Sequence, residues 1–277
     1  MSRTLVFGLS GQIGEAVLPG LLARGRPVLA VSREARVDQP GLEWTRGSLE
    51  SLTVAPSDTD LILSLGPLDA FAAWFARVRP TAGRVVAIGS AGRQDKNESA
   101  DPSERAVARQ LEAASGLLFE TAGIAGKAIT VLEPTLIYGG GRDQSLSRLV
   151  AFAQRWRFLP LPRSATGLRQ PVHVDDVANA VLQVIDEPAT HGGRYALPGG
   201  EPLRFDAMVR RTLERHAPGA RLLRLPTALF TLGLSASALL GRVPAGTGWL
   251  SRLALDQTSD GSEAGKTFGY RPRPFDP

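Results

Sequence analysis

Cysteine is absent from this chain of 277 residues, and histidine is scarce. The lack of cysteine excludes disulfides, thiolate nucleophiles, zinc fingers and iron–sulfur clusters. The three histidines, His173, His191 and His216, do not have the i, i+4 spacing that a helical HExxH metal site requires. We therefore expect no metal site, and a composition without cysteine favours a cytoplasmic protein.

Long apolar runs are missing as well. No uncharged apolar run reaches the roughly 20 residues that a membrane-spanning helix needs, so we expect no transmembrane segment. Residues 226–241 carry no charge, and three interpretations of this segment remain open. It could be a buried helix, the face of a homodimer, or a segment that lies on a membrane surface.

Clusters of one charge sign are also lacking, although the net charge is +5. Lysine occurs only as Lys96, Lys127 and Lys266, and the other basic residues are arginines spread along the whole chain. Without a run of like charge, the sequence argues against nucleic-acid binding. We expect a small-molecule substrate, which could be anionic.

Short apolar runs alternate with helical stretches in the first half of the chain. Continuous, β-branched runs predict strands that are buried on both faces, at residues 4–7, 27–31, 61–65, 84–88 and 128–132. Helices are predicted between or beside them, at residues 12–23, 69–78 and 104–122. This order predicts an α/β protein with a doubly wound parallel sheet, the Rossmann fold.

After Tyr138 the regular alternation of apolar runs and helical stretches ends. This change predicts a smaller C-terminal substrate-binding cap. A strand over residues 170–174 is expected to return towards the sheet, and further helices are predicted at residues 145–155, 175–185 and 205–216. We assign two noncontiguous segments to the dinucleotide-binding domain, residues 1–137 and 171–190. The cap then consists of residues 138–170 and 191–277.

The most informative motif is the glycine pattern GLSGQIG, which follows the first predicted strand directly and opens the first helix. In that position, backbone N–H groups and the helix N-terminus can hold a pyrophosphate. Gly8 permits the tight turn, Gly11 lets the phosphates approach, and Gly14 lets the helix pack close to the sheet. The motif predicts a set of cofactor-binding residues: Gly8, Ser10, Gly11, Gln12, Ile13 and Gly14.

The end of the second predicted strand bears on the choice of cofactor. An acidic residue at this place would bind a ribose 2′-hydroxyl, but the sequence has Ser32 and Arg33, with Arg36 beyond them. A guanidinium suits a 2′-phosphate, so we predict NADP(H) in preference to NAD(H). Ligands bind beyond the carboxyl ends of the strands, which adds five more predicted cofactor-binding residues: Leu65, Gly66, Pro67, Pro134 and Leu136.

These motifs resemble the short-chain dehydrogenase/reductase superfamily, in its extended, NAD-dependent epimerase/dehydratase-like branch. The resemblance covers nearly the whole chain, because six segments occur in the order of that family. They are GLSGQIG (8–14), RGSL (46–49), IGSA (88–91), EPTLIYG (133–139), QPVHVDDVA (170–178) and GYRPR (269–273). The resemblance implies a Rossmann fold, a nicotinamide cofactor and a catalytic Ser or Thr at Ser90.

The chain departs from this family at its acid/base pair, YxxxK. Four residues after Tyr138, Tyr195 and Tyr270 stand arginine, glycine and proline, so the pair is absent. The helix that should carry it, near residues 104–109, contains no tyrosine. The chain therefore resembles an atypical member of the superfamily.

Two residues remain as catalytic candidates, Ser90 and Tyr138. Ser90 could orient a substrate carbonyl or cap backbone groups, and Tyr138 could replace the missing phenol or pack as a wall. Arg142 and Lys96 could approach the site from loops. Arg169 stands where some family members bind a substrate phosphate, and its other interpretation is a surface salt bridge.

Two aspartates near the predicted helix 175–185 are more easily explained by structure than by chemistry. We expect Asp175 and Asp176 to cap that helix, and His173 to be a core histidine.

Three functional hypotheses follow. The chain could be an NADP(H)-dependent oxidoreductase or epimerase-like enzyme with rearranged acid/base groups. It could be a non-catalytic NADP(H)-binding sensor or accessory protein. It could also be a Rossmann-fold enzyme that catalyses a non-redox isomerisation or cyclisation.

Overall fold

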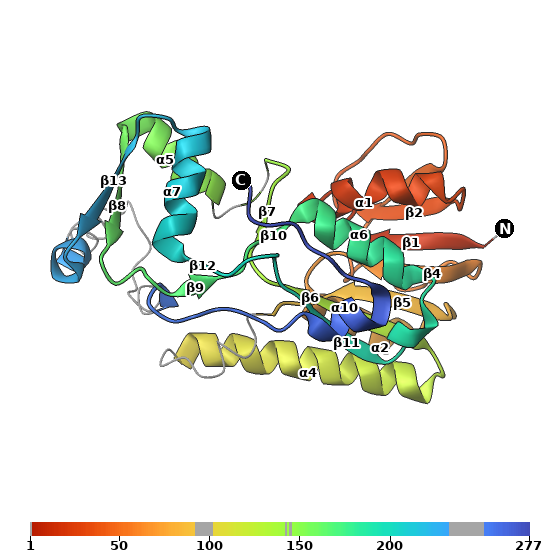
Figure 1. Ribbon diagram of the computed structural model, residues 1–277. Coiled ribbons are helices and arrows are strands. Elements are labelled where there is room, and N and C mark those ends of the chain that lie inside the picture. Colours follow the sequence, from red (N-terminus) through yellow and green to blue (C-terminus); the bar gives the residue numbers. More distant parts are fainter. Residues whose placement is uncertain (1, 92–101, 142, 144–145, 233–251) are drawn as a thin grey trace.

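A computed structural model of the chain describes residues 2–91, 102–141, 143, 146–232 and 252–277. Two parts are visible in Figure 1, a layered α/β body and a smaller cap beside it. Lys96, Arg142 and residues 233–241 of the uncharged segment lie outside the described residues.

The body is built on a seven-stranded sheet in which every neighbouring pair is parallel. The strand order is β3-β2-β1-β4-β5-β6-β11, so the direction of winding changes between β1 and β4. The strands are β1 (Arg3–Phe7), β2 (Val28–Ser32), β3 (Leu42–Arg46), β4 (Thr59–Ser64), β5 (Arg84–Ile88), β6 (Ala128–Pro134) and β11 (Gly193–Leu197). The predicted doubly wound Rossmann sheet is confirmed, and its switch point lies beyond β1 and β4.

Helices cover both faces of the sheet because its strands are apolar on both sides. In β1, for example, Val6 belongs to one hydrophobic cluster, whereas Leu5 and Phe7 belong to the other. The first cluster includes residues of α1 (Gln12–Ala23), α6 (Val174–Ile185) and α10 (Ser262–Phe268), and the second includes residues of α2 (Leu68–Val78) and α4 (Pro102–Ile124). These two layers hold the strand ends in fixed positions.

The cap carries its own small core between two helices and short strands (Figure 1). Its helices are α5 (Leu146–Trp156) and α7 (Phe205–His216), and its strands form the parallel pair β8 (Phe158–Pro162) and β13 (Arg221–Leu225) and the antiparallel pair β9 (Leu168–Arg169) and β12 (Leu203–Arg204). Asp206 joins α7 to β13 through Arg224 and also pairs with Arg204. Burial opposes ionisation of Asp206, but these arginines outweigh it and hold its pKa below the usual range.

Two chain segments lie in other sheets than the sequence predicts. The predicted strand at 170–174 shrinks to β10 (Val172–His173), which pairs with β7 (Ile137–Tyr138) and not with the central sheet. Conversely, β11 completes the central sheet beside β6, although the sequence division assigns residues 191–277 to the cap. Both differences are non-local pairings, which apolar runs alone do not specify.

Two local expectations also need correction. Helix α6 begins at Val174, and its N-cap is His173, whose Nδ1 accepts a hydrogen bond from the Asp175 backbone N–H at 3.2 Å. Asp175 and Asp176 therefore lie inside the first turn and do not cap it. In the uncharged segment, Leu229 and Leu232 are 60% and 68% exposed, so its described part is not a buried helix. No helix in the described ranges has the length and apolarity to cross a membrane.

Candidate functional site

The glycine turn between β1 and α1 brings three backbone segments into close contact. Gly8 has φ +81°, a left-handed conformation that favours glycine, and an added Cβ would lie 3.0 Å from the Leu65 carbonyl carbon. At Gly14 an added Cβ would lie 2.3 Å from the Leu9 carbonyl oxygen. Gly8 therefore fits the turn beside β4, and Gly14 lets α1 approach β1, as the sequence predicts.

The N-terminus of α1 has no hydrogen bond from a capping side chain. Gly11 is the N-cap and has no side chain to accept from the first N–H groups of the helix. The backbone N–H groups of Gln12, Ile13 and Gly14 are thus the first-turn donors of this helix. The Gln12 side chain reaches away and donates from Nε2 to the Gly139 carbonyl at 2.7 Å. The geometry suits an anion, and it places Gln12 between the turn and the glycine loop.

Three arginines surround the end of β2. The Ser32 side chain is buried, and its Oγ accepts from the Glu34 backbone N–H at 3.2 Å and from Arg36 Nε at 3.4 Å. The Arg36 guanidinium also lies over the ring of Trp44, 5.1 Å from its centroid. Arg33 is exposed, and Arg46 is the cross-strand partner of Ser32. Arg46 was not among the predicted cofactor residues, and strand register is what places it here.

The remaining predicted cofactor residues lie at the carboxyl ends of β4 and β6. Leu65 donates its backbone N–H to the Phe7 carbonyl at 2.9 Å, which ties the end of β4 to the glycine turn. Gly66 follows, and Pro67 is the N-cap of α2. Pro134 ends β6, and Leu136 precedes β7 at the wall of a cavity in the cap.

Ser90 follows β5 at the same edge of the sheet and is partly buried. Its two neighbours hold the loop to β6, because the Gly89 N–H donates to the Leu132 carbonyl and the Ala91 N–H donates to the Pro134 carbonyl. The Glu133 side chain packs against Gly89 and is bound at 2.9 Å by Arg194 of β11. Glu133 thus has a local role in fixing the backbone beside Ser90.

Tyr138 is buried, and its hydroxyl is bound by the protein backbone. Its side chain packs edge-on against His173 and Phe275, with ring centroids 5.0 Å and 4.8 Å away. Its hydroxyl oxygen accepts from the Asp276 backbone N–H at 3.2 Å, and the hydroxyl donates to the Pro274 carbonyl at 3.5 Å. Burial raises the pKa of the phenol, which further disfavours its ionised form. Of the two roles open to Tyr138, acid or packing residue in the wall of the site, this geometry favours the packing role.

A substitution separates those two roles. If Tyr138 is a wall, Tyr138→Phe keeps the ring packing and loses only the hydroxyl's backbone contacts, so we expect the turnover rate to change less than about tenfold. If it is the acid, the rate should fall by about 100-fold or more. Steady-state rates over a pH series measure this, with far- and near-ultraviolet circular dichroism as the check on folding. A large loss of rate at unchanged structure would contradict the wall assignment.

One cavity opens at the junction with the cap, and another lies within the cap. The first, of about 460 Å³, is bounded by the glycine loop 139–141, His173, and residues of α5 and α7. The second, of about 350 Å³, is mostly apolar and includes Leu136 and Arg169. Arg169 is neither a surface salt bridge nor fully exposed, because it is buried and donates to the carbonyls of Leu255 at 2.8 Å and Arg252 at 2.6 Å.

The C-terminal arm, residues 269–277, has a role that was not predicted from the sequence. Asp176 accepts hydrogen bonds from the backbone N–H and the side chain of Arg273, both at 3.0 Å, and the Tyr270 hydroxyl donates to the Pro198 carbonyl at 2.8 Å. An added Cβ on Gly199 would lie 1.8 Å from the Pro171 carbonyl oxygen. The GYRPR motif was the only signal, and it marks an arm that connects the body to the cap at Tyr138.

Comparison with solved structures confirms the fold that the motifs indicate. MoeE5 in complex with UDP-glucose and NAD matches with a TM-score of 0.70 at 20% identity, over 99% of this chain and 94% of that chain. UDP-glucuronic acid 4-epimerase from Bacillus cereus in complex with NAD matches with a TM-score of 0.72 at 13% identity, over 98% and 93%. A third match is the NAD-dependent NDP-hexosamine 5,6-dehydratase TunA, with a TM-score of 0.66 at 15% identity, over 98% and 92%.

Comparisons of sequence show less similarity to known proteins than the comparison of structures does. No protein-family model matches the chain. One curated protein, the mitochondrial NADH dehydrogenase (ubiquinone) 1 alpha subcomplex subunit 9 of Dictyostelium discoideum, is 27% identical over 93 residues. That match covers 34% of this chain and 26% of the other protein. The resemblance to epimerases and dehydratases is thus confirmed in the fold, which this chain shares along almost its whole length.

Proposed function

We propose that the chain is an NADP(H)-dependent oxidoreductase or epimerase-like enzyme of the extended short-chain dehydrogenase/reductase type. The observation that carries this proposal is the open N-terminus of α1 behind the glycine turn, at the switch point of the sheet. Residues 1–137 and 171–190 would bind the cofactor, together with strand β11. The cap would bind the substrate.

The residues present fit a dinucleotide. The first-turn N–H groups of α1 would hold the diphosphate, and Gly8 and Gly14 keep the turn free of side chains that would block it. At the end of β2, Ser32 stands where a carboxylate usually binds the ribose 2′-hydroxyl. Arg33 and Arg36 would supply guanidinium groups for a 2′-phosphate, and Arg36 also lies 3.9 Å from the Glu34 carboxylate. This supports NADP(H), although the structures compared above contain NAD.

Ser90 is the residue we assign to the reacting end of the site. A bound nicotinamide would exchange hydride with a substrate carbon. The Ser90 hydroxyl would donate a hydrogen bond to the oxygen on that carbon, and the Glu133–Arg194 pair would keep the supporting loop in place. MoeE5 binds UDP-glucose and UDP-glucuronic acid, which supports a sugar nucleotide as the anionic substrate.

A titration with reduced cofactors tests the proposal. We expect NADPH to bind with a Kd in the micromolar range and to show altered fluorescence, and NADH to bind at least tenfold more weakly. Arg33→Asp should remove most of that preference, because it replaces a phosphate-binding cation by an anion. Arg26→Asp, a change of equal charge on the loop before β2, is the matched control and should leave the preference intact.

Two results would contradict the assignment. Equal weakening of NADPH and NADH in Arg33→Asp would mean that the end of β2 does not select the cofactor. No heat on mixing with any pyridine dinucleotide, in a folded sample, would remove nucleotide binding itself.

A non-catalytic NADP(H)-binding role is the second candidate. It is favoured by one specific observation, since the hydroxyl of Tyr138 is already bound by the C-terminal arm. Turnover of NADPH with UDP-sugars, ketones or imines separates the candidates. Ser90→Ala should then lower the rate about 100-fold if Ser90 acts as proposed, while binding without turnover in the unmodified chain supports the second role.

A further inference from the structure

The outer end of the cap carries three aromatic side chains in contact with solvent. Phe152, Trp156 and Phe158 are 40%, 52% and 37% exposed. The ring of Phe152 lies 6.4 Å from that of Trp156 and 6.1 Å from that of Phe158, so the three form one cluster. An exposed group of large apolar side chains on a protein marks an interaction surface more often than chance exposure does.

Aliphatic side chains extend this cluster along the strand pair. In the parallel pair β8–β13, Phe158 stands opposite Arg221 and Pro160 stands opposite Leu223. Because side chains alternate along a strand, these residues share the outer face, while Leu159 faces the core of the cap. Leu223 is 40% exposed. We call the surface made by Phe152, Trp156, Phe158, Leu223, Arg155 and Arg157 the cap face.

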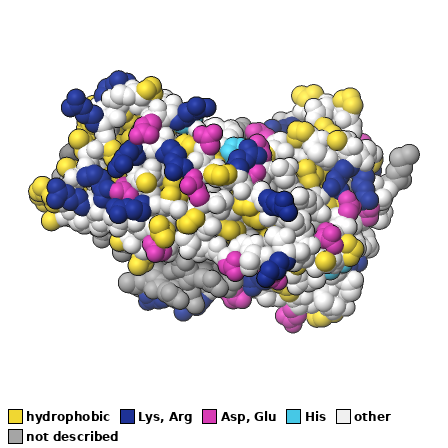
Figure 2. All heavy atoms as spheres, viewed as in Figure 1, with side chains coloured by type: hydrophobic (Ala, Val, Ile, Leu, Met, Phe, Trp, Pro, Cys, Tyr) yellow, Lys and Arg dark blue, Asp and Glu magenta, His cyan; other side chains and the backbone are white. Residues whose placement is uncertain are grey.

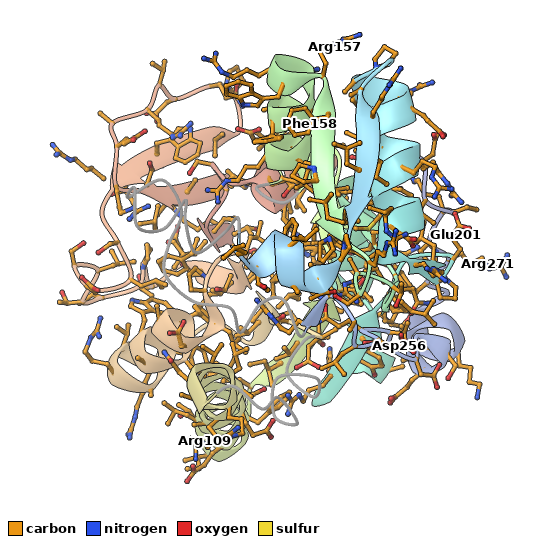
Figure 3. The ribbon with its side chains drawn as sticks, turned by 90° about the vertical axis from the view of Figure 1, so that its left-hand side faces the viewer. Arg109, Arg157, Phe158, Glu201, Asp256 and Arg271 are labelled. Carbon is orange, nitrogen blue, oxygen red and sulfur yellow. The ribbon has the colours of Figure 1, made fainter. Side chains whose placement is uncertain are left out.

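The described chain segments that build this face are rich in arginine. Residues 146–174 contain five arginines and no aspartate or glutamate, and residues 215–232 contain three arginines and no acidic residue. Of these, Arg169 is buried on backbone carbonyls and Arg224 pairs with Asp206, so the others carry the charge of the surface. Asp206 of α7 lies behind the strands, buried and already paired with Arg204 and Arg224. Figure 2 shows Lys and Arg side chains beside hydrophobic ones at this end of the molecule, with a few Asp and Glu among them, and Figure 3 shows Arg157 at the upper edge with Phe158 below it.

We propose that the cap face docks on the surface of an anionic phospholipid bilayer. Tryptophan and phenylalanine suit the boundary between headgroups and acyl chains, and arginines around them are attracted to anionic headgroups. This inference goes beyond the proposed function, since it concerns a surface remote from the cofactor site and needs no bound nucleotide.

Two other occupants fit the same observations less well. A second copy of the chain in a symmetric dimer would set these arginines against one another, which is repulsive. A single-stranded nucleic acid would need open aromatic faces, but Arg155 lies over Trp156, 5.4 Å from the ring centroid, and the Phe158 ring stands at 88° to that of Phe152. Leu223, which is exposed on the same face of the strand pair as Phe158, also suits an acyl boundary better than a base.

Sedimentation with lipid vesicles tests the proposal. We expect the protein to bind vesicles of phosphatidylcholine mixed with phosphatidylglycerol, to bind pure phosphatidylcholine vesicles at least tenfold more weakly, and to dissociate as salt rises. Arg155→Gln and Arg157→Gln should each weaken binding about fivefold. Trp156→Ser should weaken it about tenfold and lose the blue shift in tryptophan emission that insertion produces.

A control and a set of contrary outcomes complete the experiment. Arg109→Gln removes one exposed arginine from α4, at the opposite edge in Figure 3, and should leave vesicle binding unchanged. Thermal unfolding of each variant confirms that it is folded. The proposal would be overturned by equal binding to both vesicle types, by no binding to either, or by an equal loss of binding in the Arg109 variant. It would also be overturned by a dimer that dissociates in Trp156→Ser, or by tighter binding to single-stranded RNA than to vesicles.

Discussion

Replacing Gly14 by alanine should destabilise the protein by about 3 kcal/mol and abolish measurable dinucleotide binding. The added Cβ would lie 2.3 Å from the Leu9 carbonyl oxygen, 2.4 Å from the Leu9 Cα and 2.5 Å from the Gly8 carbonyl oxygen. All three are backbone atoms of the turn itself, so none can rotate away. Relief therefore requires α1 to move off β1, which displaces the N–H groups that would hold the diphosphate.

Gly116→Ala is the matched control for this experiment. Gly116 lies in the interior of α4, and an added Cβ there meets no atom within 4 Å. Alanine is the better helix former, so we expect this variant to be more stable by about 0.5–1 kcal/mol. Urea unfolding followed by circular dichroism measures both variants, and nucleotide titration measures binding. Equal stability of the two variants would show that close packing at the turn does not constrain position 14.

Replacing Arg84 by methionine should also cost about 3 kcal/mol or more of unfolding free energy. The guanidinium lies at the amino end of β5, where burial lowers its pKa to about 10 and leaves it protonated near pH 7. It donates to Thr130 Oγ1 at 2.9 Å, Thr190 Oγ1 at 3.1 Å and the Ile185 carbonyl at 3.2 Å. Further bonds reach the carbonyls of Val85, Ala128 and Val184. Methionine fills the volume but removes all six of these hydrogen bonds, although Thr190 Oγ1 and the Val184 carbonyl keep other donors.

Arg26→Met serves as the control for Arg84. Arg26 is nearly half exposed and pairs with Asp60 at 3.2 Å on the surface, where an ion pair contributes less than about 1 kcal/mol. Urea denaturation should therefore shift its midpoint little, while that of Arg84→Met falls clearly. Cofactor affinity should be kept in Arg84→Met once it is folded, because Arg84 lies at the edge of the sheet opposite the nucleotide. A midpoint as high as that of the control would show that the network is dispensable.

The predictions from sequence were best where a short segment carries its own signal. The five apolar runs became β1, β2, β4, β5 and β6, and each end lies within two residues of its prediction. The glycine pattern placed Gly8 and Gly14 in the conformations and contacts that the motif requires. Such features depend on residues close together in the chain, so their physical causes are readable locally.

Predictions failed where distant segments compete for the same place. Nothing near Tyr138 in the sequence reveals that Asp276 donates to its hydroxyl, since the two residues meet only through the fold. The position of β11 beside β6 depends likewise on a partner more than 50 residues away. Asp176 has the pattern of a helix cap, yet it binds Arg273 from the C-terminal arm.

The sequence alone determined the βαβ order, the glycine turn and the absence of a YxxxK pair, because each is a matter of residue type and spacing along the chain. The tertiary structure decided that Arg46 lies beside Ser32, that Tyr138 is enclosed, and that the arginines and aromatic rings of the cap meet on one face. Those outcomes depend on which strands pair and which surfaces pack. Pairing and packing are set by the balance of burial and hydrogen bonding over the whole chain, and no local pattern encodes that balance.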